Sequence, residues 1–180
     1  MKKLFILGAL ASAVAFSSVA SANSGTINFT GTITSATCTV SPVVGGGVAS
    51  SIDLGTPGTD LTTAKTVQFS LTPAGPSAAD CLAKTAADVS WSAPNMDAAG
   101  LGNSGGSATG VSLQLKAKNA TKADELVTDT NRTIAYAGTG TPATPLTTFD
   151  YEAQLVKTVK SGTVSAGSFA TSASYTVAYK

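Results

Sequence analysis

Apolar and polar residues alternate along most of this chain, and the alternation is clearest close to its N-terminal region. In residues 24–38 (SGTINFTGTITSATC), Ile27, Phe29 and Ile33 fall on one side of an extended strand, and threonine and asparagine side chains fall on the other, because successive side chains of a strand point to opposite faces. One face of this segment is therefore expected to be buried. Chain ends are loosely held unless something ties them down, so the surface that receives this face lies either in the same molecule or in another.

The same period of two recurs through the rest of the chain and predicts an all-β, antiparallel sandwich. The longer alternating runs that we expect to be strands are 67–71, 87–91, 111–117, 149–155 and 175–179. Shorter strands are expected at 52–54 and 133–136, and only the alanine-rich residues 77–87 are expected to form a short helix. Turn-forming glycine and proline residues separate these runs, at 42–47, 57–58, 73–76, 100–110, 138–145 and 162–167.

The first residues have the three parts of a secretion signal. A basic start (MKK) precedes an apolar run over residues 4–16, and the small residues of SSVASA follow. We expect residues 1–22 to be removed, with cleavage after Ala20 as the alternative, which leaves residues 23–180 as one domain. A membrane anchor is the competing interpretation, but the apolar run is short and a cleavage pattern follows it. No later stretch is apolar enough to span a bilayer.

The charge of the chain narrows the kinds of partner. Its formal net charge is +1 and it has no basic cluster, which argues against nucleic acid or an anionic membrane surface as the partner. Charged residues make up 12% of the chain, about half of the roughly 25% that is usual in soluble domains. Such a surface is short of the charges that normally keep sheet edges apart.

The chain has two cysteines, Cys38 and Cys81, and no histidine. In an exported protein the oxidising compartment favours a disulfide between them. A thiol nucleophile or a metal pair is the competing interpretation, but it needs a base or further ligands, which the absence of histidine makes scarce. We therefore predict a disulfide.

Two further patterns have the form of chemical motifs without the context that the chemistry needs. Residues 100–105 (GLGNSG) match the dinucleotide fingerprint, but a strand is expected after them instead of the helix whose N-terminus holds the pyrophosphate. Asp150 and Glu152 lie two apart on one strand, on the face opposite its apolar residues, so they are expected to be solvated and not to act as an acid–base pair. Trp91 lies on the apolar face of its own strand and is expected in the core. We expect no catalytic, cofactor-binding or metal-binding residues.

Both ends of the chain, together with the cysteines, resemble one family. The segment NSGTINFTGTITSATC is similar to the N-terminal extension and first strand of chaperone-usher fimbrial subunits, the type 1 pilin family, whose pattern is Gly-Thr-Val/Ile-x-Phe-x-Gly followed by Cys. The matching positions are Gly25, Thr26, Ile27, Phe29, Gly31 and Cys38. The second family cysteine matches Cys81, the penultimate tyrosine matches Tyr179, and the glycine fourteen places from the end matches Gly167.

The resemblance implies an immunoglobulin-like sandwich that lacks its final strand and is completed by a donor strand from a chaperone or a neighbouring subunit. Residues at about 23–34 would be that donor strand for the next copy. The donor positions would be Gly25, Ile27, Phe29, Gly31 and Ile33. A periplasmic chaperone would pair with the last strand and anchor the carboxylate of Lys180. The positions involved would be Gly167, Tyr175, Val177, Tyr179 and Lys180.

The function implied by this resemblance is a structural subunit of a cell-surface fimbria, which polymerises by donor-strand exchange and supports adhesion. Its partners would be the chaperone, an outer-membrane usher, further copies of itself and other pilus subunits, without a cofactor. It would pass through the periplasm to the cell surface. The alternative is a secreted β-sandwich that folds alone and binds a carbohydrate or a receptor, with residues 100–110 as a binding loop.

Overall fold

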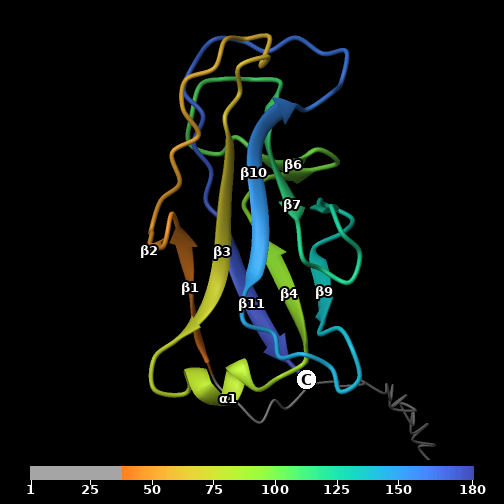
Figure 1. The fold of residues 1–180 in the computed structure, drawn as a ribbon. Helices are drawn as coiled ribbons and strands as arrows, with labels where there is room; N and C mark the ends of the chain where they lie inside the picture. The colour runs from red at the N-terminus through yellow and green to blue at the C-terminus, as the bar shows by residue number, and fades with distance from the viewer. Residues whose placement is uncertain (1–37) are drawn as a thin grey trace, which may run out of the picture. The chain divides into compact units, whose positions relative to one another are not determined.

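Two antiparallel β-sheets form the framework of residues 38–180, the part of the chain that this computed structural model describes (Figure 1). The elements are β1 (Thr39–Val44), β2 (Gly47–Val48), β3 (Thr66–Ala74), α1 (Ala78–Leu82), β4 (Ala86–Ser92), β5 (Met96–Asp97), β6 (Gly100–Gly102), β7 (Val111–Ala117), β8 (Glu125–Val127), β9 (Thr133–Ala137), β10 (Phe149–Lys157) and β11 (Ser174–Tyr179). The larger sheet has the strand order β2-β1-β3-β10-β7-β6-β5, with β8 paired to β7, and the smaller sheet has the order β11-β4-β9. This arrangement confirms the predicted all-β, immunoglobulin-like sandwich.

The alternating runs of the sequence correspond to strands. The five longer runs lie in β3, β4, β7, β10 and β11, and the short run at 133–136 lies in β9. The alanine-rich segment forms α1, the one helix of residues 38–180, which is short as expected. Each long strand buries one side chain in two, because only one face of its sheet meets the other sheet.

Several local predictions were wrong, among them the turn at 73–76, because Pro73 and Ala74 lie inside β3 and pair with β1. Residues 52–54 are not a strand: Ile52 and Leu54 are half-buried, but within residues 38–180 the segment pairs with no neighbour. Pro42 lies inside β1 and not in a turn; its carbonyl accepts the Ala49 N–H at 2.9 Å, so its hydrogen-free nitrogen faces away from β3 and costs no ladder bond. The start of the 100–110 loop forms β6, where a Cβ on Gly100 would lie 2.1 Å from the Leu113 carbonyl oxygen.

The core lies between the two sheets and is built around Trp91. Its Nε1 donates to the Tyr151 hydroxyl at 3.0 Å across the sheets, and the two rings lie 5.1 Å apart in an edge-to-face arrangement. The ring of Phe69 stacks on Tyr151 at 5.4 Å. The expected core position of Trp91 is thus confirmed, and its indole N–H has the partner that a buried polar group requires.

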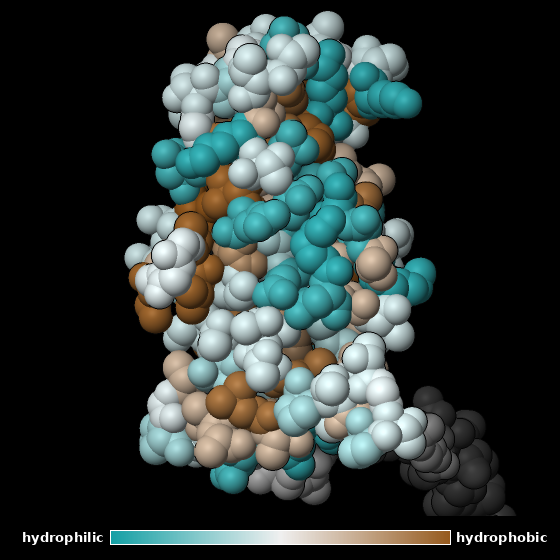
Figure 2. Space-filling view, viewed as in Figure 1, coloured by the Kyte–Doolittle hydropathy of each residue, from teal (hydrophilic) through white to brown (hydrophobic). Residues whose placement is uncertain are grey.

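The outer face of the larger sheet carries the charged residues. Figure 2 shows this face over β3 and β10 as mainly hydrophilic, while apolar surface gathers at the margin formed by β1 and β2. Asp150 and Glu152 lie on the outer face as expected, but they are half-buried. The Ser70 hydroxyl donates to Asp150 at 2.7 Å, and Lys116 Nζ lies 3.5 Å from Glu152. Both carboxylates therefore have partners on the sheet surface.

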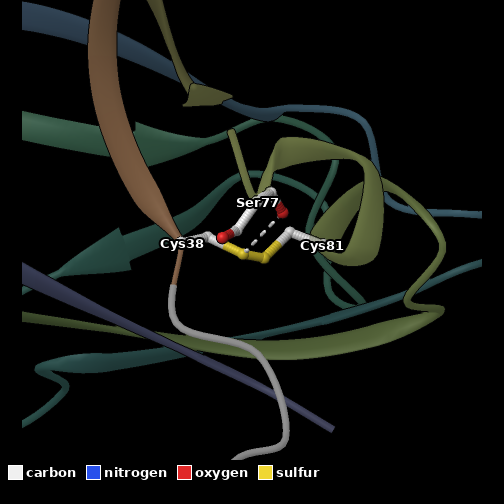
Figure 3. Close-up of a disulfide and its surroundings, with 3 residues drawn as sticks. All are labelled: Cys38, Ser77 and Cys81. Atoms are coloured by element: carbon white, nitrogen blue, oxygen red, sulfur yellow. Dashed lines mark hydrogen bonds between the residues drawn. A yellow bond between two sulfur atoms is a disulfide. The ribbon is translucent and has the colours of Figure 1, made fainter. Parts of the chain in front are cut away.

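A disulfide between Cys38 and Cys81 ties the start of β1 to α1, as predicted (Figure 3). The two Cα atoms are 6.3 Å apart, and Cys81 is fully buried. The Cys38 sulfur also lies 3.6 Å from the Ser77 carbonyl oxygen, a contact and not a hydrogen bond because a disulfide sulfur carries no proton. The bond fixes Cys38, the residue before β1, next to the C-terminal end of β3.

Removing this disulfide should lower the stability of the folded protein markedly. A crosslink over a sequence separation of 43 residues constrains the unfolded chain by roughly 4 kcal/mol, so the double variant Cys38→Ala/Cys81→Ala should melt about 10 °C lower. The measurement is thermal unfolding followed by circular dichroism, and titration of the denatured wild-type protein should find no free thiol. Two titratable thiols in the wild type would contradict the bond.

The buried tyrosines should make the protein unfold in alkali. Burial raises the pKa of Tyr151 and of Tyr179 to about 12, and it also raises the pKa of Tyr136, from an ordinary value of 10.0. In the unfolded chain these groups lose their protons first, so stability should be constant below pH 10 and fall between pH 10 and 12. Circular dichroism and tyrosinate absorbance, recorded on the same samples, should change together. Ionisation of all tyrosines near pH 10 in a still-folded protein would contradict this.

Candidate functional site

A groove with an apolar floor runs between the two sheets, on the side where β1 and β11 lie. One cavity of about 450 Å³ lies between residues 49–54 and residues 169–175, over a floor of Phe69, Leu71, Trp91, Leu101, Leu113 and Leu115. A second cavity of about 610 Å³ continues it between residues 52–59 and 164–169, over Ala108, Val111 and Leu155. The two share Ile52, Leu54 and Phe169, so they form one groove.

One wall of the groove is an unpaired strand edge. Among the described strands, β11 pairs with β4 alone. The Lys180 N–H donates to the Ala86 carbonyl at 2.8 Å, so even-numbered residues of β11 direct their backbone groups toward β4. Because these groups alternate in direction along a strand, Tyr175, Val177 and Tyr179 direct theirs toward the free edge.

The same alternation continues before β11, where residues 164–173 are not part of either sheet. The carbonyls of Ser168 and Ala170 accept N–H groups from Ala108 and Ser104 at 3.0 and 2.9 Å. Ser168 and Ala170 thus bind the 103–109 loop on the side away from the groove, and nearer the start of this segment the Ser165 N–H donates to the Thr109 carbonyl at 3.1 Å. The backbone groups of the odd-numbered residues from Phe169 onward therefore face the groove, in line with those of β11.

The opposite wall is formed by β1 and by the segment that follows β2. In β1 the Pro42 carbonyl points away from β3, toward Ala49, and the preceding residues up to Ser41 have no strand on that side within the described range. Residues 49–54 then run along the groove with Ile52 and Leu54 turned inward. The groove thus has an apolar floor and strand-like edges on both sides, which is the arrangement that accepts an added β-strand.

Tyr175 joins the two walls. Its hydroxyl donates to the Val40 carbonyl oxygen at 2.6 Å, and its ring packs against Trp91 with centroids 5.6 Å apart. Burial raises the pKa of Tyr175, so its hydroxyl can donate up to a higher pH than that of an exposed tyrosine. The side chain therefore spans from β11 to β1.

The structure brings most of the predicted last-strand residues together. Tyr175, Val177 and Tyr179 share the inner face of β11, and Tyr179 is 4% exposed, with its ring 5.8 Å from Phe149. Lys180 is exposed just after β11, and its Nζ lies 2.6 Å from an Asp88 carboxylate oxygen. The inner-face residues are thus part of the domain's own core as well as of its free edge.

Gly167 lies in the loop before β11 and not in the strand itself. Its φ is +157°, and a Cβ there would lie 2.6 Å from the Ala108 backbone nitrogen and from the Ser107 hydroxyl oxygen. Only glycine lets the two segments approach this closely. Gly167 therefore positions the far wall of the groove against the 103–109 loop.

The donor positions Gly25, Ile27, Phe29, Gly31 and Ile33, like the expected signal at 1–22, lie outside the described residues. Residues 103–109, which complete the glycine-rich motif, lead into β7 and not into a helix. Within residues 38–180, acidic and cysteine side chains do not gather in a group of three that could hold a metal ion. The one helix in that range, α1, is too short to cross a membrane.

Sequence reasoning missed both groove walls outside the strands, residues 49–59 and 164–173. The inward positions of Ile52 and Leu54 were detected, but as a strand. For the other wall the signal was weak, since Phe169 is its single large apolar side chain among small residues. Neither segment pairs within either sheet, so a pattern of side chains alone could not identify them as edges.

Comparison with known proteins identifies the family of this groove-bearing sandwich. The chain is 39% identical over 188 residues to the K99 fimbrial protein of Escherichia coli, with 99% of each chain covered. The chain belongs to the chaperone-usher fimbrial subunits. It is also 30% identical over 184 residues to the F107 fimbrial protein of Escherichia coli, with both chains fully covered. No protein-family model matches the sequence. These two fimbrial relatives indicate a structural role for the chain. They also confirm the resemblance to fimbrial subunits that was found in the sequence.

In this fimbrial subunit, Gly167→Ala should destabilise the fold. The added methyl would overlap backbone atoms of the 103–109 loop, and the φ of +157° is unfavourable for alanine, so we expect a loss of about 2–4 kcal/mol. The matched control is Gly47→Ala, where the nearest atom to a Cβ is 3.9 Å away and φ is not restricted to glycine. Urea unfolding of both variants gives the comparison, and equal stabilities would contradict the positioning role of Gly167.

Proposed function

We propose that this protein is a building subunit of a surface fimbria that polymerises by donor-strand exchange. In this mechanism, residues 23–34 of one copy occupy the groove of the next copy. The observation that carries the proposal is the groove itself, an apolar floor bounded by the free edge of β11 on one side and by β1 and residues 49–54 on the other. An added strand would satisfy both edges and cover the floor.

The proposed donor segment fits the groove in length and in pattern. Residues 23–34 are twelve residues, long enough to pair along the eleven residues from Phe169 to Tyr179. Ile27, Phe29 and Ile33 would face the apolar floor, and the threonines between them would face solvent. Gly25 and Gly31 would suit places where the walls come too close for a side chain. Burying Ile27 and Phe29 alone would contribute roughly 3 to 6 kcal/mol.

The proposed contact is head to tail, because the donor segment and the groove are different surfaces of the same subunit. A contact of this kind repeats without closing and gives an open filament. Pilus subunits, including other copies of this chain, are therefore the partners in the filament, and a cell-surface fimbria is its location. Support of adhesion is the role we propose for that filament.

Before assembly, we propose that a periplasmic chaperone occupies the groove and that an outer-membrane usher receives the subunit. Residues 1–22 would direct export to the periplasm. An unpaired edge beside an apolar floor favours pairing with another chain. This supports the proposal that a chaperone occupies the groove until the subunit is assembled. The end of β11 suits such a partner, since Tyr175, Val177 and Tyr179 offer free backbone groups and Lys180 is exposed.

The double variant Ile27→Ser/Phe29→Ser should remain folded but fail to polymerise. These side chains serve the groove of a neighbour in this proposal, so their loss weakens the filament contact by roughly 3 to 6 kcal/mol and leaves the subunit's own core intact. The measurements are the yield and melting temperature of the subunit from the periplasm, and the number of surface filaments seen by electron microscopy. The matched control is Thr30→Ser/Thr32→Ser on the opposite face of the same segment, which should form normal filaments.

Two outcomes would overturn the proposal, in different ways. Normal filaments from the Ile27→Ser/Phe29→Ser variant would exclude donor-strand exchange through these residues. An unfolded or degraded variant would indicate that the segment closes its own domain, because two large-to-small core changes cost roughly 4 to 10 kcal/mol. That result would favour the alternative of a self-contained binding module for a carbohydrate or a receptor.

A further inference from the structure

The groove ends where the Tyr175 side chain crosses it. The cavity between residues 49–54 and 169–175 is lined by Pro42 on one wall and by Tyr175 on the other. Val40 and Val177, the next inward-lying positions of β1 and β11, do not line it and instead pack against the core. The hydrogen bond from the Tyr175 hydroxyl to the Val40 carbonyl, 2.6 Å long, lies at this boundary.

The Val40 carbonyl belongs to the edge of β1 that faces away from β3. Pro42, two residues further on, directs its carbonyl to the same side and there accepts the Ala49 N–H. Val40 lies beyond the reach of β2, which pairs with β1 at Val43 and Val44. A partly buried carbonyl needs a donor, and in this structure the Tyr175 hydroxyl is that donor. A strand added beside β1 would need the same carbonyl for its own ladder.

The ring of Tyr175 is held in place independently of its hydroxyl. It packs against Trp91 at 5.6 Å, and Trp91 is fixed in turn by its hydrogen bond to Tyr151. A phenylalanine at this position would keep the ring contact and lose only the bond across the groove. The hydroxyl and the packing of this residue can therefore be separated by one substitution.

We infer that Tyr175 is a clasp, a side chain whose hydroxyl ties β11 to β1 and must release Val40 before a strand can occupy that end of the groove. The inference rests on the proposed donor-strand function. It adds that the free subunit resists full occupation of its groove through one named hydrogen bond. The edge at Phe169, Thr171 and Ala173 is open to an incoming strand, whereas the edge at Val177 and Tyr179 becomes available only when the clasp opens.

The test uses the full chain carrying Ile27→Ser/Phe29→Ser, so that its own segment cannot fill a neighbour's groove. A fluorescent synthetic peptide with the wild-type sequence of residues 23–34 is added, and its uptake is followed by anisotropy. Tyr175→Phe in this background should raise the rate of uptake about three- to ten-fold, the range expected for loss of one neutral hydrogen bond. The matched control is Tyr136→Phe. Tyr136 is also a buried tyrosine, but it does not line the groove, so loss of its hydroxyl should leave the rate of peptide uptake unchanged.

Hydrogen exchange during uptake gives a second measurement that does not depend on the rate alone. With Tyr175 present, the amides of Thr171 and Ala173 should become protected before those of Val177 and Tyr179. In the Tyr175→Phe protein, both pairs should become protected together. Melting curves of all variants, recorded without peptide, check that the free proteins are folded.

The outcomes separate the clasp from the proposed function. Equal uptake rates with and without the Tyr175→Phe substitution, or simultaneous protection of both amide pairs in the presence of Tyr175, would overturn the clasp and leave donor-strand exchange standing. An absence of uptake and of amide protection in every variant would overturn the proposed function and the clasp with it. Faster uptake in the Tyr136→Phe control as well would also overturn the clasp, because the effect would then not belong to the groove.

Discussion

The unpaired edge of β11 is the constraint on which the rest of this fimbrial subunit depends. Backbone N–H and C=O groups require partners when they are covered, and those of Phe169, Ala173 and Tyr175 face a groove and not a neighbouring strand. The floor beneath them is apolar. A domain with such an edge can accept a further strand, and in the proposed mechanism this unpaired edge is what would make assembly favourable.

The core of the sandwich also serves as the floor of the groove. Phe69 and Trp91, which pack with Tyr151 between the sheets, line the groove as well. Occupation of the groove would therefore extend the core of the subunit and not only cover its surface. The disulfide strengthens the same region, because Cys38 immediately precedes the β1 wall and is fixed to α1.

The wall formed by residues 164–173 is held by a loop and not by a sheet. Ser165, Ser168 and Ala170 bind the 103–109 loop through their backbone groups. The loop approaches closely because residues 106 and 167 are glycines, and a Cβ on Gly106 would lie 2.0 Å from the Ser168 carbonyl oxygen. This contact occupies the outer side of the wall and leaves its inner side free. The glycine-rich segment, which has the form of a nucleotide motif in the sequence, thus has a structural part in shaping the groove.

Much of the fold followed from the sequence, because a strand with one buried face leaves a period of two that can be recognised locally. This held for β3, β4, β7, β10 and β11, for the core position of Trp91 and for the pairing of Cys38 with Cys81. The residues that match the family pattern were also identifiable in the sequence. Those near the start form one continuous stretch, and those near the end lie at fixed distances from the last residue.

What only the tertiary structure decided is where strand edges remain unpaired. Ile52 and Leu54 have the side-chain pattern of a strand, yet their segment has no ladder partner within residues 38–180; Pro42 has the composition of a turn, yet it lies in β1. The bond between Tyr175 and Val40 joins residues at opposite ends of the described chain. Side-chain periodicity reports which face of a segment is buried, whereas backbone pairing depends on which distant segments lie alongside it, and that is fixed only when the whole sandwich has folded.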